Sequence, residues 1–204
     1  MRVSILCESM PGNTADLAED VMEGLLDLGA TVALADATSV PAQVLPDCGL
    51  LVLAAPTHAL TLSRPTDRAE AVRKGADPVH ALSGLREWLT NLHETIPATT
   101  ARPSVAVFDT RVRPGHLPRS AAQSVERALK RLGFQVVSRA SFSVESIAGL
   151  VTAGEHERAR EWGRVLADLV PLREATSEVP LPFSLGPLAG QMRPAAAPYL
   201  AHVY

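Results

Sequence analysis

The spacing of apolar positions switches repeatedly between two patterns along the first 170 residues. Short and nearly continuous apolar runs are typical of parallel strands that are covered on both faces. Strand-like runs occur at 3–7, 31–35, 49–55, 104–108 and 134–142. Apolar residues that recur every three or four positions predict helices at 14–28, 83–94, 120–132 and 155–170. Strands that alternate with helices predict an α/β fold built on a parallel sheet.

One segment is too long for this alternation. Residues 56–82 separate a strand from its helix, whereas such connections usually take about 2–6 residues. Part of the segment, at 66–74, predicts a short helix. Open α/β sheets bind ligands at the carboxyl ends of their strands, in the loops that follow. This segment is therefore a candidate for ligand contact.

The last part of the chain has a different composition. Residues 179–204 hold five prolines and one charged residue, Arg193. Proline prevents regular structure, and the apolar content is unlike that of a solvated tail. We expect a folded domain over 1–172 and an extended Pro/Ala-rich C-terminal arm over 173–204. The arm would lie on the domain or on a partner subunit, and the second arrangement would make a homodimer; a mere linker remnant is the alternative.

Composition and charge exclude several classes of protein. Apolar residues make up 47% of the 204 residues, enough for a sizeable core, and the net charge of −3 argues against a nucleic-acid binder. The two cysteines, Cys7 and Cys48, exclude a disulfide scaffold and a cysteine-only zinc site. Cys7 ends a buried strand and is expected to be inert. The apolar run near the N-terminus is too short for a signal peptide or membrane span, so we expect a cytoplasmic protein with no membrane contact.

The turn between the first strand and the first helix carries candidate chemistry. It reads ESMPGNT, residues 8–14, with hydroxyl groups near both ends and a glycine in the bend. The N–H groups at a helix N-terminus attract anions, and Gly12 permits close backbone approach. The turn lacks the lysine of a nucleotide triphosphate loop and the repeated glycines of a dinucleotide turn. It predicts either a phosphate site or an ordinary helix cap made by Asn13 or Thr14.

This chain resembles the flavodoxin-like family, whose phosphate loop reads Ser/Thr-x-Thr-Gly-x-Thr at the place of Ser9-Met10-Pro11-Gly12-Asn13-Thr14. Two further segments support the resemblance: Pro56-Thr57-His58-Ala59 after the third strand and Asp109-Thr110-Arg111 after the fourth. The resemblance implies a three-layer αβα fold with a five-stranded parallel sheet in the order 2-1-3-4-5. It also implies an FMN whose phosphate lies on the 9–14 turn and whose isoalloxazine ring lies between the other two loops.

The FMN-binding residues implied by the resemblance are Ser9, Met10, Gly12, Asn13, Thr14, Pro56, Thr57, His58, Ala59, Asp109, Thr110 and Arg111. The implied function is electron transfer or small flavin reductase activity, with a redox partner protein. Arg111, Arg113 and Arg119 outnumber Asp109 near this edge, which suggests a small anionic substrate as another partner.

The chain departs from the family pattern in three ways, one of which is that the charges near the site, described above, are not those of an electron carrier with an acidic face. Pro11 replaces a threonine and so removes one hydroxyl and one N–H from the phosphate loop. The loops at 56–65 and 109–118 contain no aromatic residue to stack on a flavin. The last two departures favour an alternative, a flavodoxin fold that has lost FMN and serves as a binding or assembly module. Visible absorption and FMN titration would separate the two functions.

Overall fold

The computed structural model describes residues 1–8, 12–41, 48–97, 100–112, 119–146 and 149–170. The strands are β1 (Arg2–Cys7), β2 (Thr31–Asp36), β3 (Leu50–Pro56), β4 (Ser104–Val112) and β5 (Val136–Val144). The helices are α1 (Asn13–Asp27), α2 (Pro65–Arg73), α3 (Leu85–Thr95), α4 (Ala121–Arg131) and α5 (Glu155–Leu169), with a short 3₁₀ helix, η1 (Pro78–Ala81). The strands pair in parallel in the order β2-β1-β3-β4-β5, as predicted. Residues 173–204, the predicted arm, lie outside the described residues.

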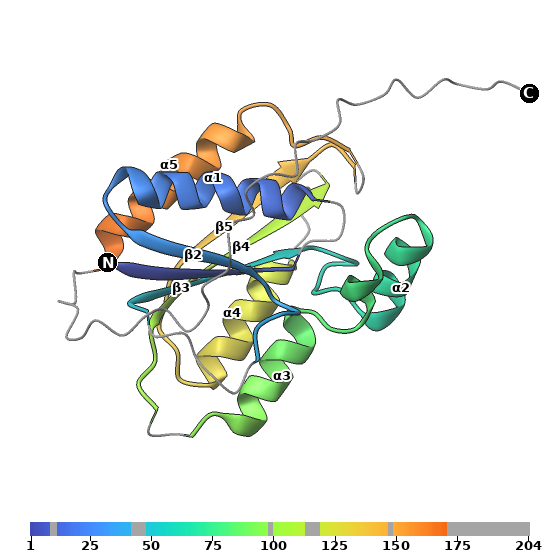
Figure 1. Cartoon of the computed structure of the whole chain (residues 1–204), viewed down its shortest axis with the longest axis horizontal. Helices are drawn as coiled ribbons and strands as arrows, with labels where there is room; N and C mark the ends of the chain where they lie inside the picture. Colours follow the sequence, from blue (N-terminus) through green and yellow to red (C-terminus); the bar gives the residue numbers. More distant parts are fainter. Residues whose placement is uncertain (9–11, 42–47, 98–99, 113–118, 147–148, 171–204) are drawn as a thin grey trace, which may run out of the picture.

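Helices cover both faces of the sheet and make the three layers that the sequence predicts (Figure 1). On one face, Leu17 and Val21 of α1 and Leu166 of α5 pack on alternate residues of the central strands. On the other face, Trp88 of α3 and Val125 of α4 pack on the remaining residues of the same strands, whose side chains point to this side. Side chains of a strand point alternately to opposite faces, so β3, buried along its whole length, contributes to both cores.

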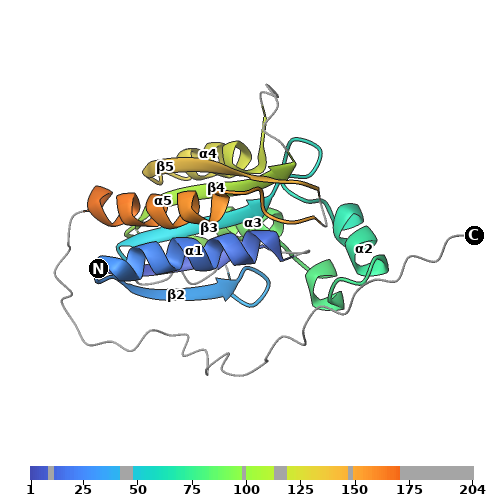
Figure 2. The same cartoon turned by 90° about the horizontal axis from the view of Figure 1, so that it is seen from above.

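Helices α1 and α5 lie side by side on their face of the sheet (Figure 2). Two glycines permit this close approach. A Cβ atom on Gly24 would lie 1.9 Å from the carbonyl oxygen of Arg160, and one on Gly163 would lie 2.3 Å from that of Val21. No real side chain fits such gaps, so the glycines allow the two backbones to touch.

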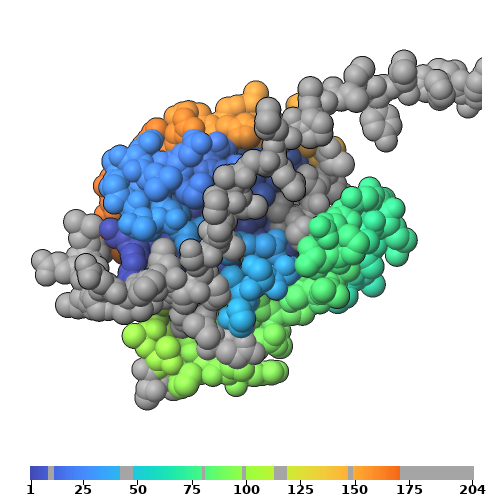
Figure 3. Space-filling view, in the orientation of Figure 1, coloured from blue at the N-terminus to red at the C-terminus, as the bar shows by residue number. Residues whose placement is uncertain are grey.

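The long 56–82 segment contains α2 and η1. The short helix predicted at 66–74 is found as Pro65–Arg73, while η1 was not expected. Together they form a bulge on one side of the molecular surface (Figure 3). No helix in the described part of the chain is long and apolar enough to span a membrane.

Strand β4 is longer than its apolar run suggests. Asp109, Thr110 and Arg111, expected in a loop, belong to the strand. They pair with Ser141–Ser143 of β5, and Asp109 and Thr110 also pair with the end of β3. Hydrogen bonds from neighbouring strands thus extend β4 through polar residues that a hydrophobic pattern assigns to a loop.

Candidate functional site

The three predicted loops meet at one edge of the sheet. Because the strands are parallel, β1, β3 and β4 all end at this carboxyl edge. A cavity of about 30 Å³ there is lined by Asn13, Pro56, Thr57, His58, Thr110, Arg111, Val112 and Val144. Members of all three predicted segments therefore come together. The cavity has room for about one water molecule, so a cofactor would have to lie over this edge rather than inside it.

The first turn ends at a glycine with a positive φ angle. Gly12 is the N-cap of α1 with φ +98°, and a Cβ atom placed on it would meet no atom of the described residues within 4 Å. Among the described residues, no side chain caps this helix. The alternative prediction that Asn13 or Thr14 caps α1 is therefore wrong, because both residues lie inside the helix. Ser9, Met10 and Pro11 lie outside the described residues.

The side chains of Asn13 and Thr14 bind elsewhere in the protein. Asn13 Nδ2 donates to the carbonyl oxygen of Gly149 at 2.8 Å. Thr14 Oγ1 lies 2.8 Å from Thr110 Oγ1 in a buried hydroxyl pair. The predicted phosphate turn is thus held in place by β4 and by the segment before α5. These bonds leave the backbone around Gly12, rather than the Thr14 hydroxyl, as the group available to an anion.

Two of the predicted flavin-contacting residues cap α4. Asp109 Oδ2 accepts a hydrogen bond from the Ala122 N–H at 2.8 Å, and Thr57 Oγ1 accepts one from the Ala121 N–H at 2.9 Å. Ser120, the N-cap, accepts a third from the Gln123 N–H. A carboxylate at a helix N-terminus is favoured by the helix dipole. Thr57 and Asp109 therefore have a structural role that the loop-based prediction missed.

The second loop contains a tight turn between His58 and Thr61. Each residue donates its N–H to the carbonyl of the other at 2.9 Å. Ala59 and Leu60 occupy its two central positions with φ of 43° and 67°, where Asn-Gly is usual. Such backbone strain costs about 1–3 kcal/mol per residue and often marks a functional segment. The turn exposes Ala59, one of the predicted flavin contacts.

His58 is the first residue of this turn, and one of its ring nitrogens has no hydrogen-bond partner among the described residues. This nitrogen, Nε2, is buried. Burial lowers the pKa of His58, so the imidazole is neutral near pH 7. A neutral ring can donate or accept one hydrogen bond at Nε2, depending on its tautomer. His58 therefore remains a candidate contact for a ligand at this edge.

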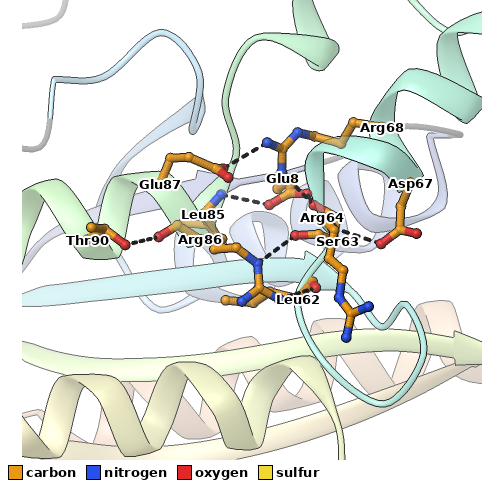
Figure 4. A network of polar contacts seen from close by, with 10 residues as sticks. All are labelled: Glu8, Leu62, Ser63, Arg64, Asp67, Arg68, Leu85, Arg86, Glu87 and Thr90. Atoms are coloured by element: carbon orange, nitrogen blue, oxygen red, sulfur yellow. Dashed lines mark hydrogen bonds and ion pairs between the residues drawn. The ribbon is translucent and has the colours of Figure 1, made fainter.

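A buried carboxylate connects the first turn to the second loop. Glu8 follows β1 directly and is only 2% exposed. Its Oε1 accepts from the Ser63 hydroxyl, and its Oε2 accepts from the Leu85 N–H at 2.7 Å (Figure 4). Burial, the largest effect, raises the pKa of Glu8 above its usual value. The only sequence signal was an acidic residue immediately after an apolar strand.

Two arginines complete this network. Arg68 of α2 is 1% exposed, donates to the Ser63 hydroxyl at 3.0 Å and pairs with Glu87 of α3 at 3.0 Å. Arg86 of α3 donates to the carbonyl oxygens of Ser63 at 2.9 Å and Leu62 at 2.6 Å. The 56–65 loop is therefore held by an arginine of α2 and an arginine of α3 (Figure 4). Sequence periodicity could not reveal a buried arginine in a helix as polar as α2.

The carboxyl edge of the sheet is less basic than the count of arginines in its loops predicted. Arg68 is buried against Glu87 and adds no free charge. The outer face of α1 presents Asp16, Glu19, Asp20 and Glu23 beside a wide depression of about 680 Å³. Arg111 is half-buried, and its Nε has no partner among the described residues. An anion at this edge would rely on backbone N–H groups and Arg111 rather than on a broad basic field.

The prediction that Cys7 is inert agrees with its surroundings. The thiol is buried in the sheet core, and desolvation raises its pKa well above the usual value. A thiol that stays protonated is a poor nucleophile.

The described part of the first turn is compatible with a phosphate monoester. Among the described residues no side chain caps α1 and none fills the space beside Gly12, and such a helix start suits a phosphate group. At the other end of this edge, the exposed Ala59, the unpartnered His58 Nε2 and Arg111 are the predicted residues still able to contact a flat ring.

Comparisons with known proteins bear on the fold. No protein-family model and no curated protein matches the chain. Its structure is similar to that of an archaeal flavodoxin, with 15% identity over 82% of this chain and 97% of that one and a TM-score of 0.57. It is also similar to a Streptococcus pneumonia TIGR4 flavodoxin. The two are 18% identical over 83% of this chain and 100% of the flavodoxin, with a TM-score of 0.55.

A third likeness is to a much longer protein. The flavodiiron protein from Giardia intestinalis is 16% identical over 82% of this chain but only 35% of its own length, with a TM-score of 0.53. At such identities the likeness concerns architecture. Together with the strand order, these comparisons show that the chain has a flavodoxin-like fold.

Proposed function

We propose that the chain binds FMN at the carboxyl edge of its sheet and acts in electron transfer or as a small flavin reductase in the cytoplasm. The observation that carries the proposal is the contrast between two helix N-termini at this edge. Helix α4 is capped by Asp109, Thr57 and Ser120, whereas α1 begins at Gly12 with no side-chain cap among the described residues. An uncapped helix start suits an external anion.

The phosphate would be held by the backbone at Gly12, Asn13 and Thr14. The ring would be contacted by the loop that carries His58 and Ala59 and by Arg111. FMN, when bound, supplies the one- or two-electron chemistry. The protein positions these groups through the Thr14–Thr110 pair, the α4 caps and the Glu8 network.

Arg111 supports an anionic partner. It is half-buried with an unpartnered Nε among the described residues, so a carboxylate or an acidic surface would complete its hydrogen bonds. The partner would be a redox protein or a small anionic substrate. The proposed homodimer through the 173–204 arm stays a prediction, since the arm lies outside the described residues.

The second candidate is a flavodoxin fold without flavin that serves as a binding or assembly module. It is favoured by the internal hydrogen bonds of Thr14, Thr57, Asp109 and Thr110. In this case the polar residues of the edge maintain the fold and need no cofactor.

An FMN titration of two glycine variants tests the proposal. Gly12 and Gly75 have nearly equal φ angles, +98° and +102°, and at each a Cβ atom would meet nothing within 4 Å in the described part of the chain. Alanine at either position strains the backbone by about 1–2 kcal/mol. Gly12→Ala should weaken FMN binding about fivefold or more, whereas Gly75→Ala, in the turn after α2, should leave it unchanged. Equal FMN affinities in the two variants would contradict a phosphate position at Gly12. A wild-type chain that binds no FMN would favour the second candidate.

A further inference from the structure

A cleft of about 330 Å³ lies between α3 and α4, and none of the flavin-binding residues proposed above is among those that line it. The two helices lie on the same face of the sheet and both run from its carboxyl edge towards the opposite edge (Figure 1). The cleft is lined by Thr61, Leu62, Arg86, Leu89, Thr90, His93, Ser124, Ala128, Arg131 and Leu132. This volume is at the lower end of the range for small-molecule pockets.

The lining combines an apolar floor with positive charge. Leu62 and Leu89 are buried, and Ala128 and Leu132 are half-buried, so the floor can cover an apolar body. Arg86 and Arg131 line the same cleft together with His93, and no acidic residue lines it within the described part of the chain. None of these three basic residues has an ion-pair partner among the described residues. An apolar floor with unopposed cations is complementary to an amphipathic anion.

Helix electrostatics explain only part of this charge. His93 and Arg131 lie in the last turns of α3 and α4, and a cation such as Arg131 stabilises a helix at that end. Arg86 is the second residue of α3, where a cation is unfavourable. Its Nε and Nη2 donate to the Ser63 and Leu62 carbonyls, which orient the guanidinium without neutralising it. Its Nη1 makes no hydrogen bond within the described part of the chain and so can donate to a ligand.

We propose that this cleft binds a small carboxylic acid with an apolar body. The carboxylate would lie at Arg86, close to the Thr61 and Ser124 hydroxyls, which are 3.3 Å apart. The apolar body would lie along Leu89, Ala128 and Leu132. A singly charged carboxylate is favoured over a phosphate dianion because the C-termini of both helices bring partial negative charge to the far end of the cleft. The site is independent of FMN and extends beyond the proposed redox function.

Octanoate is the probe, titrated by calorimetry into the full chain without FMN. Octan-1-ol tests the need for charge, and inorganic phosphate tests the need for the apolar body. Octanoate should bind with saturation at one site, and each comparison compound should bind at least tenfold more weakly. Octanol that binds as tightly as octanoate, phosphate that binds as tightly, or no octanoate binding at millimolar concentration would overturn the proposal.

Variants on α4 locate the site without disturbing Arg86 and the loop it holds. Ala128→Phe fills the cleft and should abolish octanoate binding. Arg131→Gln should weaken binding about two- to fivefold, as expected for an exposed charge. The matched control is Arg127→Gln, since Arg127 is an exposed arginine of the same helix outside the cleft. Equal losses of octanoate affinity in the two arginine variants would indicate diffuse electrostatic attraction and contradict the site. This comparison tests the proposal even if Ala128→Phe fails to fold.

Discussion

The side-chain oxygens of Thr14 and Thr110 lie 2.8 Å apart although the residues are 96 positions apart in the sequence. The pair joins the first turn of α1 to the carboxyl end of β4 beneath the proposed phosphate position. Both hydroxyls are buried, with Thr14 1% exposed. A bond of this kind holds the start of the helix at a fixed place on the sheet.

The Thr14–Thr110 pair should behave as a coupled unit in unfolding experiments. Thr14→Val or Thr110→Val leaves the other hydroxyl buried without its partner, which should reduce the free energy of unfolding by about 1–2 kcal/mol. The double valine variant should lose less than the sum of the single losses, because no polar group is then left unpaired. Urea unfolding of all four proteins measures this. Strictly additive losses would show that the two hydroxyls do not stabilise each other.

Alanine at Gly163 should destabilise the chain. In an unconstrained helix, replacing glycine by alanine stabilises by about 0.5–1 kcal/mol. Here the new Cβ would lie 2.3 Å from the Val21 carbonyl oxygen, so α1 and α5 must move apart. We expect a loss of about 1–3 kcal/mol in unfolding free energy. The sign of the change in unfolding free energy tests this prediction. A Gly163→Ala protein that is more stable than wild type would mean that the two helices do not touch there.

Glu8 should make stability depend on pH in an unusual direction. Burial raises its pKa in the folded chain above the ordinary value of 4.5. Its contribution is therefore fully present below the unfolded pKa and is lost as pH rises through the folded pKa. Relative to Glu8→Gln, which cannot ionise, the wild-type chain should lose stability as pH rises from 4.5 towards neutrality.

Thermal unfolding of wild type and Glu8→Gln at several pH values from 4.5 to 8 provides the measurement for Glu8. The difference between the two proteins removes the contribution of the other titrating groups. A wild-type chain that gains stability relative to Glu8→Gln over this range would mean that the Ser63 and Leu85 hydrogen bonds and the nearby charge of Arg68 outweigh burial.

Restoring threonine at position 11 should improve FMN binding. Pro11 lies outside the described residues, so this prediction rests on the resemblance to the flavodoxin-like phosphate loop. Pro11→Thr adds one N–H and one hydroxyl near the phosphate, and each such bond contributes about 1.5–3 kcal/mol when it involves a charge. The dissociation constant of FMN should fall roughly tenfold or more. Pro11→Ala, which adds only the N–H, should give an intermediate value; an unchanged affinity in both would remove the loop from the phosphate site.

The architecture could be predicted from sequence because burial dictates the apolar pattern. Strands covered on both faces, such as β3, must be continuously apolar, and helices packed on one side show a regular period. The parallel arrangement then brings the ends of β1, β3 and β4 to one edge, as expected. The meeting of Asn13, Thr57 and Thr110 at that edge follows from topology rather than from any local signal.

Individual polar contacts could not be predicted in the same way. Thr57 accepts from an α4 N–H group 64 positions later in the sequence, and Asp109 from one 13 positions later. Neither separation produces a periodic pattern in the sequence. Arg68 is buried because Ser63 and Glu87 provide its partners, which depends on how α2 packs. The start of α1 also differs from the side-chain cap that was one of the two predicted alternatives, because the Asn13 and Thr14 side chains have more distant partners.

FMN and riboflavin titrations of the purified chain, followed by flavin fluorescence, test the central claim most directly. The two ligands share the isoalloxazine ring and differ in the phosphate. If α1 begins at an anion site, FMN should bind in a one-to-one complex and riboflavin at least tenfold more weakly. Equal binding of the two flavins, or no change in fluorescence with either, would contradict a phosphate site at Gly12.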